Sequence, residues 1–191
     1  MEVYLVRHTP VHNPRKLCYG QSDIDLSPDW EQHFDDLKQK LRQQTEGAIF
    51  YSSPYERCTR LADFLSGNNF QTDTRISEMN FGEWEQCPWT EIDQTVLNQW
   101  MADFVTYKVP GGESFEIMHS RCSSFWDELL QRTFPKVVII THAGVIRSTL
   151  AGVLNIPLNN IFQLEIDYSS VSKITVNKRQ GCYQTINYIN L

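Results

Sequence analysis

The sequence predicts an α/β fold, a three-layer α/β/α sandwich around a mainly parallel sheet. Two short runs, residues 3–6 (VYLV) and 137–140 (VVII), have the continuous apolar character of strands buried on both faces. The first run leads into Arg7 and His8, and the second leads through one threonine into His142. Open α/β sheets place their chemistry just beyond the carboxyl ends of such strands. We therefore expect the two histidines to share one pocket.

The first half of the chain supplies two predicted helices and a further strand. Residues 27–41 are predicted as an amphipathic helix capped at Ser27, because apolar side chains recur there with helical spacing after a Ser-Pro pair. Residues 48–51 (AIFY) have the character of a second buried strand. Residues 53–56 (SPYE) match a capping box with proline at the first helical position. This pattern predicts a second helix with Arg57 on its first turn.

The middle of the chain lacks the regular pattern of a strand or a helix. Residues 76–110 are expected to be irregular, and they are rich in aromatic side chains: Trp84, Trp89, Trp100, Phe104 and Tyr107. Ser114 then opens a long predicted helix, and another helix follows the strand at 137–140. This order of strands and helices places helices on both faces of the sheet.

The last part of the chain alternates more between apolar and polar residues. We expect strands at residues 161–166, 171–176 and 183–189, which would close the sheet and form an antiparallel edge. Gly181 is expected to turn the last hairpin.

Composition narrows the class of protein. The 191 residues suit a single domain, and a net charge of −6 argues against a nucleic-acid partner, which requires a basic face. No run approaches the roughly 20 apolar residues of a membrane span, and no signal-peptide pattern precedes the first strand. The five cysteines are scattered and form no C-x-x-C pair, so we expect a cytoplasmic protein without a disulfide framework or a zinc site.

The pair Arg7 and His8 has the residue types that phosphoryl chemistry needs. Arginine offers a planar fork of donors that fits phosphate oxygens, and a neutral imidazole beside it can attack phosphorus and form a phosphohistidine. Taken alone, such a pair is more often structural, with the histidine satisfied at a strand end. Other segments must support the catalytic interpretation.

Two further segments add anion-binding groups. Arg57 would lie at a helix N-terminus, where free N–H groups and the helix dipole already attract anions. His142 and Ala143 follow the predicted strand at residues 137–140, and an imidazolium at His142 would add positive charge. The structural alternatives are a solvated surface arginine and a strand-end histidine bonded to the backbone.

A proton donor for the leaving oxygen is also required. Glu78 and Glu83 are the candidates, because a carboxyl group among aromatic side chains can hold its proton toward neutral pH. Each is otherwise an ordinary surface carboxylate, and the sequence leaves the choice between them open.

Taken together, four segments resemble the histidine phosphatase superfamily, in its phosphoglycerate-mutase-like branch, over nearly the whole chain. They are residues 5–8 (LVRH), 51–58 (YSSPYERC), 78–85 (EMNFGEWE) and 141–147 (THAGVIR). Within the superfamily the chain is most similar to the α-ribazole phosphatases of cobalamin synthesis. The residues behind this finer resemblance are 18–23 (CYGQSD) and 110–115 (PGGESF).

The resemblance implies a phosphoglycerate-mutase-like fold and a role for each matching residue. His8 would be the phosphorylated nucleophile, with Arg7, Arg57 and His142 on the phosphoryl oxygens. Glu78 would be the proton donor and later general base, with Glu83 as the second choice. The remaining substrate-binding positions would be Asn13, Tyr19, Gly20, Gln21, Glu83 and Ala143. The family needs no metal or other cofactor, because fixed cationic donors take that place.

The chain also departs from the family pattern. Thr9 and Pro10 stand where the family usually has glycine and then Glu or Gln, and the stretch to Asn13 is one residue shorter. This departure puts the placement of Asn13 in doubt more than the role of His8. Thr9 would either donate its hydroxyl to the phosphate or only fill the loop.

Residues 76–112 are expected to form an aromatic cap inserted in a single domain of residues 1–191. The aromatic side chains would stack on a planar base such as dimethylbenzimidazole, or form a small satellite core, and for Trp100 and Phe104 the satellite core is the favoured alternative.

The implied partner is a small-molecule phosphomonoester, α-ribazole 5′-phosphate first, with no nucleic acid and no membrane. A homodimer through the tail strands is compatible with the sequence, but nothing requires it. The alternatives are a broad-specificity phosphatase, a mutase, and a non-catalytic phosphate-binding module on the same fold.

Overall fold

A six-stranded sheet forms the centre of the protein, whose computed structural model describes residues 1–178 and 181–191. The strand order is β3-β2-β4-β1-β5-β6, and the strands are β1 (Glu2–Arg7), β2 (Ile49–Ser52), β3 (Gln71–Thr72), β4 (Lys136–Thr141), β5 (Val171–Asn177) and β6 (Tyr183–Tyr188). The pairs from β3 to β1 are parallel, whereas β1 with β5 and β5 with β6 are antiparallel. The predicted, mainly parallel sheet with an antiparallel edge is therefore confirmed.

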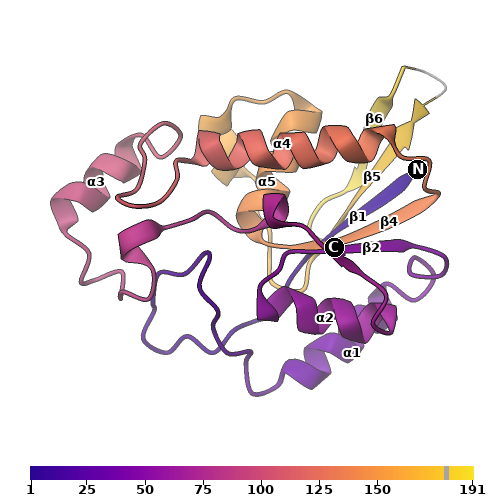
Figure 1. Cartoon of the computed structure of the whole chain (residues 1–191), viewed down its shortest axis with the longest axis horizontal. Helices are drawn as coiled ribbons and strands as arrows, with labels where there is room; N and C mark the ends of the chain where they lie inside the picture. The colour runs from indigo at the N-terminus through magenta and orange to yellow at the C-terminus, as the bar shows by residue number, and fades with distance from the viewer. Residues whose placement is uncertain (179–180) are drawn as a thin grey trace.

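Helices cover both faces of this sheet (Figure 1). The helices are α1 (Trp30–Lys40), α2 (Glu56–Ser66), α3 (Gln94–Ala102), α4 (Phe115–Gln131) and α5 (Ala143–Leu154). Helices α1 and α2 lie on one face and α4 and α5 on the other, while α3 extends away from the sheet. The three-layer α/β/α arrangement is confirmed.

The two faces of β1 explain its continuous apolar sequence. Val3 and Leu5 pack into the cluster beneath α4 and α5, and Tyr4 and Val6 pack into the cluster beneath α1 and α2. Because strand side chains alternate between faces, a strand covered on both sides must be apolar at every position. The strand β4 divides its side chains between the same two clusters.

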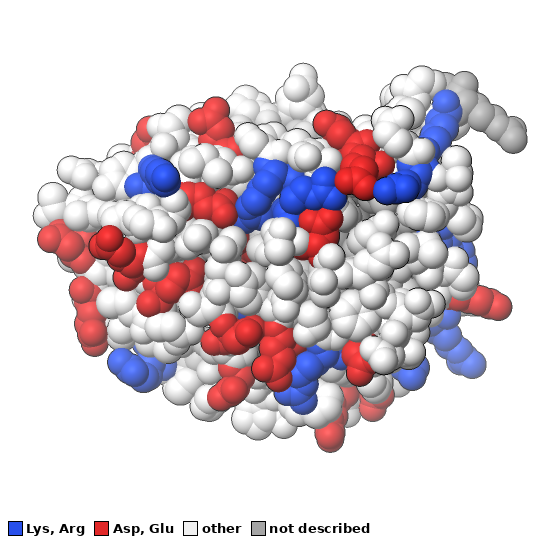
Figure 2. All heavy atoms as spheres, viewed as in Figure 1, with Lys and Arg blue, Asp and Glu red and all other residues white. Residues whose placement is uncertain are grey.

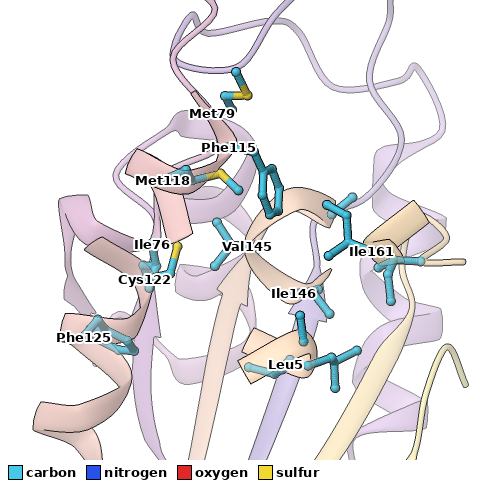
Figure 3. Close-up of a cluster of buried hydrophobic side chains, with 14 of the residues drawn as sticks. Leu5, Ile76, Met79, Phe115, Met118, Cys122, Phe125, Val145, Ile146 and Ile161 are labelled. Atoms are coloured by element: carbon cyan, nitrogen blue, oxygen red, sulfur yellow. The ribbon is translucent and has the colours of Figure 1, made fainter. Parts of the chain in front are cut away.

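The α4–α5 side of the core is drawn in Figure 3. Met118, Cys122 and Phe125 lie on the buried face of α4, and Val145 and Ile146 of α5 belong to the same cluster. All five are at most 4% exposed. This packing fixes the beginning of α5, where His142 stands.

The helix starts only partly follow the sequence prediction. Ser114 accepts a hydrogen bond from the Ile117 amide, as an N-cap residue should. The helix α1 begins later than expected, with Asp29 rather than Ser27 at its N-cap and no side-chain cap. The capping box expected at residues 53–56 does not form. Helix α2 begins at Glu56, so Pro54 lies before the helix, and the N-cap residue makes no side-chain hydrogen bond to the first turn.

Two other expectations were wrong. Residues 161–166 form no strand; a 3₁₀ helix spans Leu158–Gln163 instead. Apolar residues three apart at 158, 161 and 164 fit the three-residue turn of a 3₁₀ helix better than strand alternation. The segment 76–110 is not irregular throughout, because it contains α3 and a 3₁₀ turn at Gly82–Trp84. Within the described residues, no helix is both long and apolar enough to cross a membrane.

Candidate active site

Parallel pairing of β1 and β4 brings the two histidines together. Arg7 is in register with Thr141, and the His8 amide donates to the Thr141 carbonyl at 3.0 Å. His8 and His142 therefore leave the sheet side by side, with ring centroids 5.2 Å apart. The expectation of a shared pocket is met, although 133 residues lie between the two histidines in the sequence.

His8 is buried and oriented through its own backbone. The residue is only 2% exposed, and its Nδ1 atom is 2.8 Å from the Thr9 carbonyl oxygen. A carbonyl can only accept, so Nδ1 carries the proton and the lone pair of the neutral ring is on Nε2. Burial lowers the pKa of His8 well below its usual range, and the positive charges of Arg57 and Arg7 lower it further. The resting ring is neutral, as a nucleophile must be.

Arg57 is the most deeply placed cation of the site. It is fully buried on the first turn of α2, and its Nη1 donates to the Ser22 carbonyl at 2.8 Å. Its Nη2 donates to the Gly20 carbonyl. Its Nε is buried and has no hydrogen-bond partner in the described part of the chain. The sequence placed Arg57 on this first turn, although the expected cap is absent.

Arg7, next to His8 in the sequence, is held in a similar way. Its Nη1 donates to the Ile166 carbonyl at 2.6 Å, and its Nε is likewise buried without a partner among the described residues. Within residues 1–178 and 181–191, neither Arg7 nor Arg57 forms an ion pair with a carboxylate. Two unpaired guanidinium groups beside a neutral imidazole form a site for an anion.

His142 stands at the N-terminus of α5, fully buried. Its Nε2 is 2.7 Å from the Ser53 hydroxyl, the group expected to cap α2. Engagement of Ser53 with His142 explains why the capping box is absent. Burial lowers the pKa of His142 well below its usual range, and Arg57 is the next largest cause. The expected imidazolium is therefore not its resting state, and His142 meets an anion as a neutral hydrogen-bonding group.

Glu78 is held against the N-terminus of α5. Its Oε1 accepts from the Met79 amide at 3.0 Å, and its Oε2 accepts from the Gly144 amide at 3.1 Å. A Cβ atom on Gly144 would lie 2.2 Å from Glu78 Oε1, so only glycine permits this approach. Arg121 donates to the Glu78 backbone carbonyl at 2.9 Å and so stabilises the backbone position of Glu78. Glu78 thus faces the pocket in a fixed orientation.

Glu83, the second candidate acid, is exposed and does not line the pocket. The structure therefore favours Glu78 geometrically. Asn13 is also outside the pocket: its amide donates to the Leu17 carbonyl and accepts from the Leu17 amide, which closes a loop on itself. The structure thus places Asn13 away from this cavity, and a contact of Asn13 with substrate stays a prediction. Thr9 is fully buried and does not line the cavity either.

Gly20 and Gln21 act behind the pocket rather than along it. The Gly20 carbonyl holds Arg57, and the Gln21 side chain donates to the Glu78 carbonyl at 3.0 Å. Glu85, which the sequence did not single out, accepts hydrogen bonds from the backbone amides of residues 20, 21 and 22. Glu85 therefore orders the loop that in turn holds Arg57.

A cavity of about 260 Å³ opens beside these groups. His8, Glu78, His142 and Arg7 line one end, together with Tyr19 and Ala143. Aromatic side chains line the rest: Phe81, Trp89, Trp100, Phe104, Phe115 and Phe162. We call this part the aromatic chamber. Trp84 is instead buried in the core, and Tyr107 does not line the cavity.

The structure adds residues that the sequence did not mark as functional. Phe115 reads as a core position of α4, and Phe162 lies in the segment expected to be a strand. Arg147 belongs to a segment that carries the family resemblance, but its role was not assigned; it lies on α5, one helical turn after Ala143. Tyr168 carries no sequence signal, yet its ring lies against the Arg7 guanidinium.

Comparison with known proteins identifies the family of this chain. The sequence model of the histidine phosphatase superfamily (branch 1) matches residues 3–189. The chain belongs to the histidine phosphatase superfamily. It is therefore a phosphatase, a hydrolase that acts on phosphate monoesters.

Relatives within the family carry different names. A Hydrogenobacter thermophilus protein named "Putative phosphoserine phosphatase 2" is 28% identical, over 98% of this chain and 94% of its own. The adenosylcobalamin/alpha-ribazole phosphatase of Escherichia coli is 22% identical over 59% of this chain and 57% of its own. The alpha-ribazole phosphatase structure from Shigella flexneri superposes with a TM-score of 0.90, at 21% identity, over 100% of this chain and 96% of the other. The structural likeness establishes the phosphoglycerate-mutase-like fold.

Proposed function

We propose that this protein hydrolyses α-ribazole 5′-phosphate to α-ribazole and inorganic phosphate, through a phosphohistidine at His8, as a step of cobalamin synthesis in the cytoplasm. One observation carries the proposal: a neutral histidine with a free Nε2, beside two arginines that pair with no carboxylate among the described residues, opens directly onto an aromatic chamber. The histidine and the two arginines support the proposed chemistry, and the aromatic chamber supports the proposed choice of substrate.

In the first step the ester enters with its phosphoryl group between Arg7 and Arg57. The lone pair on His8 Nε2 attacks phosphorus in line, so that a P–N bond forms as the P–O bond to the leaving group breaks. The guanidinium groups and His142 donate to the equatorial oxygens. Glu78, protonated on one carboxyl oxygen, gives that proton to the leaving alkoxide and becomes a carboxylate. The products of this step are α-ribazole and phosphohistidine.

In the second step water replaces the leaving group. The Glu78 carboxylate takes a proton from water as the water oxygen attacks phosphorus, and the P–N bond breaks. His8 returns to its neutral form with the proton still on Nδ1, held by the Thr9 carbonyl. Glu78 is protonated again and ready for the next ester. The fixed donors supply the charge stabilisation, and no step requires a metal ion.

The aromatic chamber favours a planar leaving group. Trp89, Trp100 and Phe104 come from the segment at residues 76–112, so we propose that this segment is a cap over the chamber within a single domain. Trp100 packs edge-on against Trp84 and Phe104, with centroids 5.9 and 6.5 Å away, and so serves as core and chamber wall at once. Aromatic walls of this kind suit edge-to-face or stacked contact with a benzimidazole ring.

A second candidate substrate is phosphoserine, and Arg147 favours it. Its Nε donates to the Leu164 carbonyl at 2.9 Å, and within the described chain it forms no ion pair. Burial lowers the pKa of Arg147, so its charge is poorly solvated in the cavity that it lines. A carboxylate on the leaving group would pair with this guanidinium, and α-ribazole has no carboxylate.

The test is phosphate release in the presence of EDTA from α-ribazole 5′-phosphate, phosphoserine, 3-phosphoglycerate and p-nitrophenyl phosphate. We expect the highest kcat/KM with the ribazole ester and complete loss in His8→Ala. The matched control is His12→Ala, because His12 is exposed outside the cavity. A preference for phosphoserine that Arg147→Met removes would establish the second candidate instead. Phosphate binding without turnover by the native protein would indicate a non-catalytic module.

The choice of acid is tested separately. Glu78→Gln should lower kcat/KM by about 100- to 1000-fold, in the range of lost catalytic donors. Glu83→Gln is the matched control, since it changes the same group on an exposed side chain, and should leave kcat/KM unchanged. The reverse result would assign the acid to Glu83.

A further inference from the structure

Two tyrosines from distant parts of the chain meet above the candidate catalytic groups. Tyr19 lies in the loop that leads to Gln21, and Tyr168 lies between the 3₁₀ helix Leu158–Gln163 and β5. Their hydroxyl oxygens are 2.7 Å apart, at the solvent side of the pocket. We call this pair the tyrosine bridge. Burial, followed by the neighbouring Tyr168, raises the pKa of Tyr19, so its hydroxyl keeps the proton that the bridge needs.

Each ring of the bridge covers one of the two arginines. The Arg7 Cζ atom lies 3.6 Å from the Tyr168 ring centroid, and the Arg57 Cζ atom lies 5.2 Å from the Tyr19 ring centroid. Both distances are within the range of a cation–π contact. The bridge thus joins the covers of the two cations proposed to hold the phosphoryl group.

Tyr168 also contacts the nucleophile. Its ring meets the His8 ring edge-on, with centroids 5.5 Å apart, and the next amide, of Ser169, donates to the His8 carbonyl at 3.3 Å. Ile166, two residues earlier, accepts from Arg7. One short segment therefore holds the end of β1 through backbone contacts on both sides of the Tyr168 ring.

Burial at this end of the pocket points to the same conclusion. With the bridge in place, His8 is 2% exposed, and the Nε atoms of Arg7 and Arg57 are buried and unpaired among the described residues. Buried donors are normally hydrogen-bonded, so such a pair indicates a site that a ligand completes. His8 remains accessible from the aromatic chamber, whereas Tyr168 lies outside the lining of the cavity and is 37% exposed.

We propose that Tyr168 is a positioning residue which, bonded to Tyr19, holds an aromatic face against each of the two arginines while they bind the phosphoryl group. The proposal rests on the proposed function only in taking this pocket as the phosphoryl site. The bridge sets aromatic faces rather than water against both guanidinium groups, which strengthens their attraction for the phosphoryl oxygens.

The test uses inorganic phosphate as the probe, with its dissociation constant measured by calorimetry. Tyr19→Phe and Tyr168→Phe each keep a ring and remove one hydroxyl of the bridge. We expect each to weaken phosphate binding by about 2- to 10-fold, the range of one hydrogen bond, and the double variant to weaken it no further. Tyr183→Phe is the matched control, because Tyr183 is 64% exposed on β6, and should bind phosphate as the native protein does.

Three outcomes would overturn the proposal. Unchanged binding in both single variants would show that the bridge does not support phosphate binding, and additive effects would show that the two hydroxyls act separately. Absence of phosphate binding to the native protein would remove the phosphoryl site itself. Failure of the proposed function is distinguishable, because it appears as phosphate binding without His8-dependent turnover while the variants still report on the bridge.

Tyr168→Ala completes the series. It removes the ring that lies on Arg7 and contacts His8, so it should weaken phosphate binding more than Tyr168→Phe. Since Tyr168 is partly exposed in a loop, thermal melting is expected to change little. Equal phosphate affinity in the Ala and Phe variants would overturn the role assigned to the ring.

Discussion

Replacement of Glu85 by glutamine should lower both the stability of the protein and its kcat/KM. The two carboxylate oxygens of Glu85 accept five hydrogen bonds: Oε1 from the amides of Gln21 and Phe81, and Oε2 from the amides of Gly20 and Ser22 and from the Ser22 hydroxyl. A carboxyl group offers an acceptor oxygen on both sides. The amide of glutamine accepts through one oxygen and turns two N–H donors toward the remaining partners.

The size of the effect follows from this count. If the glutamine oxygen takes the place of Oε2, two backbone amides lose their acceptor. Each buried donor left without a partner costs about 1–3 kcal/mol, so the free energy of unfolding should fall by roughly 2–4 kcal/mol after relaxation. The loop at residues 20–22 carries the carbonyls that hold Arg57. We therefore expect kcat/KM to fall at least 10-fold even where the variant is fully folded.

Urea denaturation measures the stability, and phosphate release at a temperature well below the melting transition measures kcat/KM. Glu83→Gln is the control, because it makes the same change two residues away on an exposed side chain. Ser22→Ala removes only one of the five hydrogen bonds and should have an intermediate effect. Native stability in Glu85→Gln would refute the hydrogen-bond argument. Lost stability with native kcat/KM would refute the coupling of this loop to Arg57.

Three further predictions concern the site and the fold. Ser53→Ala removes the partner of His142 and should lower kcat/KM about 10-fold, the worth of one orienting hydrogen bond, without changing the melting temperature by more than a few degrees. His8 attacks only when neutral and its pKa is lowered, so kcat/KM should fall only as pH drops well below about 6.5; in Arg57→Gln the residual rate should fall at higher pH, because a charge that lowers this pKa is gone. Ser114→Ala removes the cap of α4 and should cost about 0.5–2 kcal/mol of stability in urea denaturation, with kcat/KM unchanged.

The sheet and the paired histidines were predictable because one physical requirement fixes both. A strand covered on two faces must be continuously apolar, and the residue that follows it must leave the sheet at the edge where ligands bind. Residues 3–6 and 137–140 meet this requirement in the sequence itself. His8 and His142 therefore stood out before their distance was known.

What the sequence did not predict depends on long-range choices. The Ser53 hydroxyl has two potential partners, the N-terminus of α2 and His142, and only the fold decides between them. Asn13 turns its amide to the Leu17 backbone, because a short loop satisfies it locally.

Tyr168 reaches Arg7 only because β5 pairs antiparallel with β1, which no local pattern around Tyr168 indicates. Figure 2 shows one face of the surface, on which acidic and basic side chains are interspersed and acidic ones gather at the end where α3 lies.

The central position of β1 also governs when the site can be assembled. A ribosome makes β1 first, but its two neighbours in the sheet, β4 and β5, are made at residues 136–141 and 171–177. Until most of the chain has emerged, the nascent polypeptide carries an apolar strand without partners, a state prone to aggregation and a target for chaperones. Pairing over such separations is slow. Premature termination before β5 would therefore leave a product with all the proposed catalytic residues but without one of the two strands that hold the nucleophile in place.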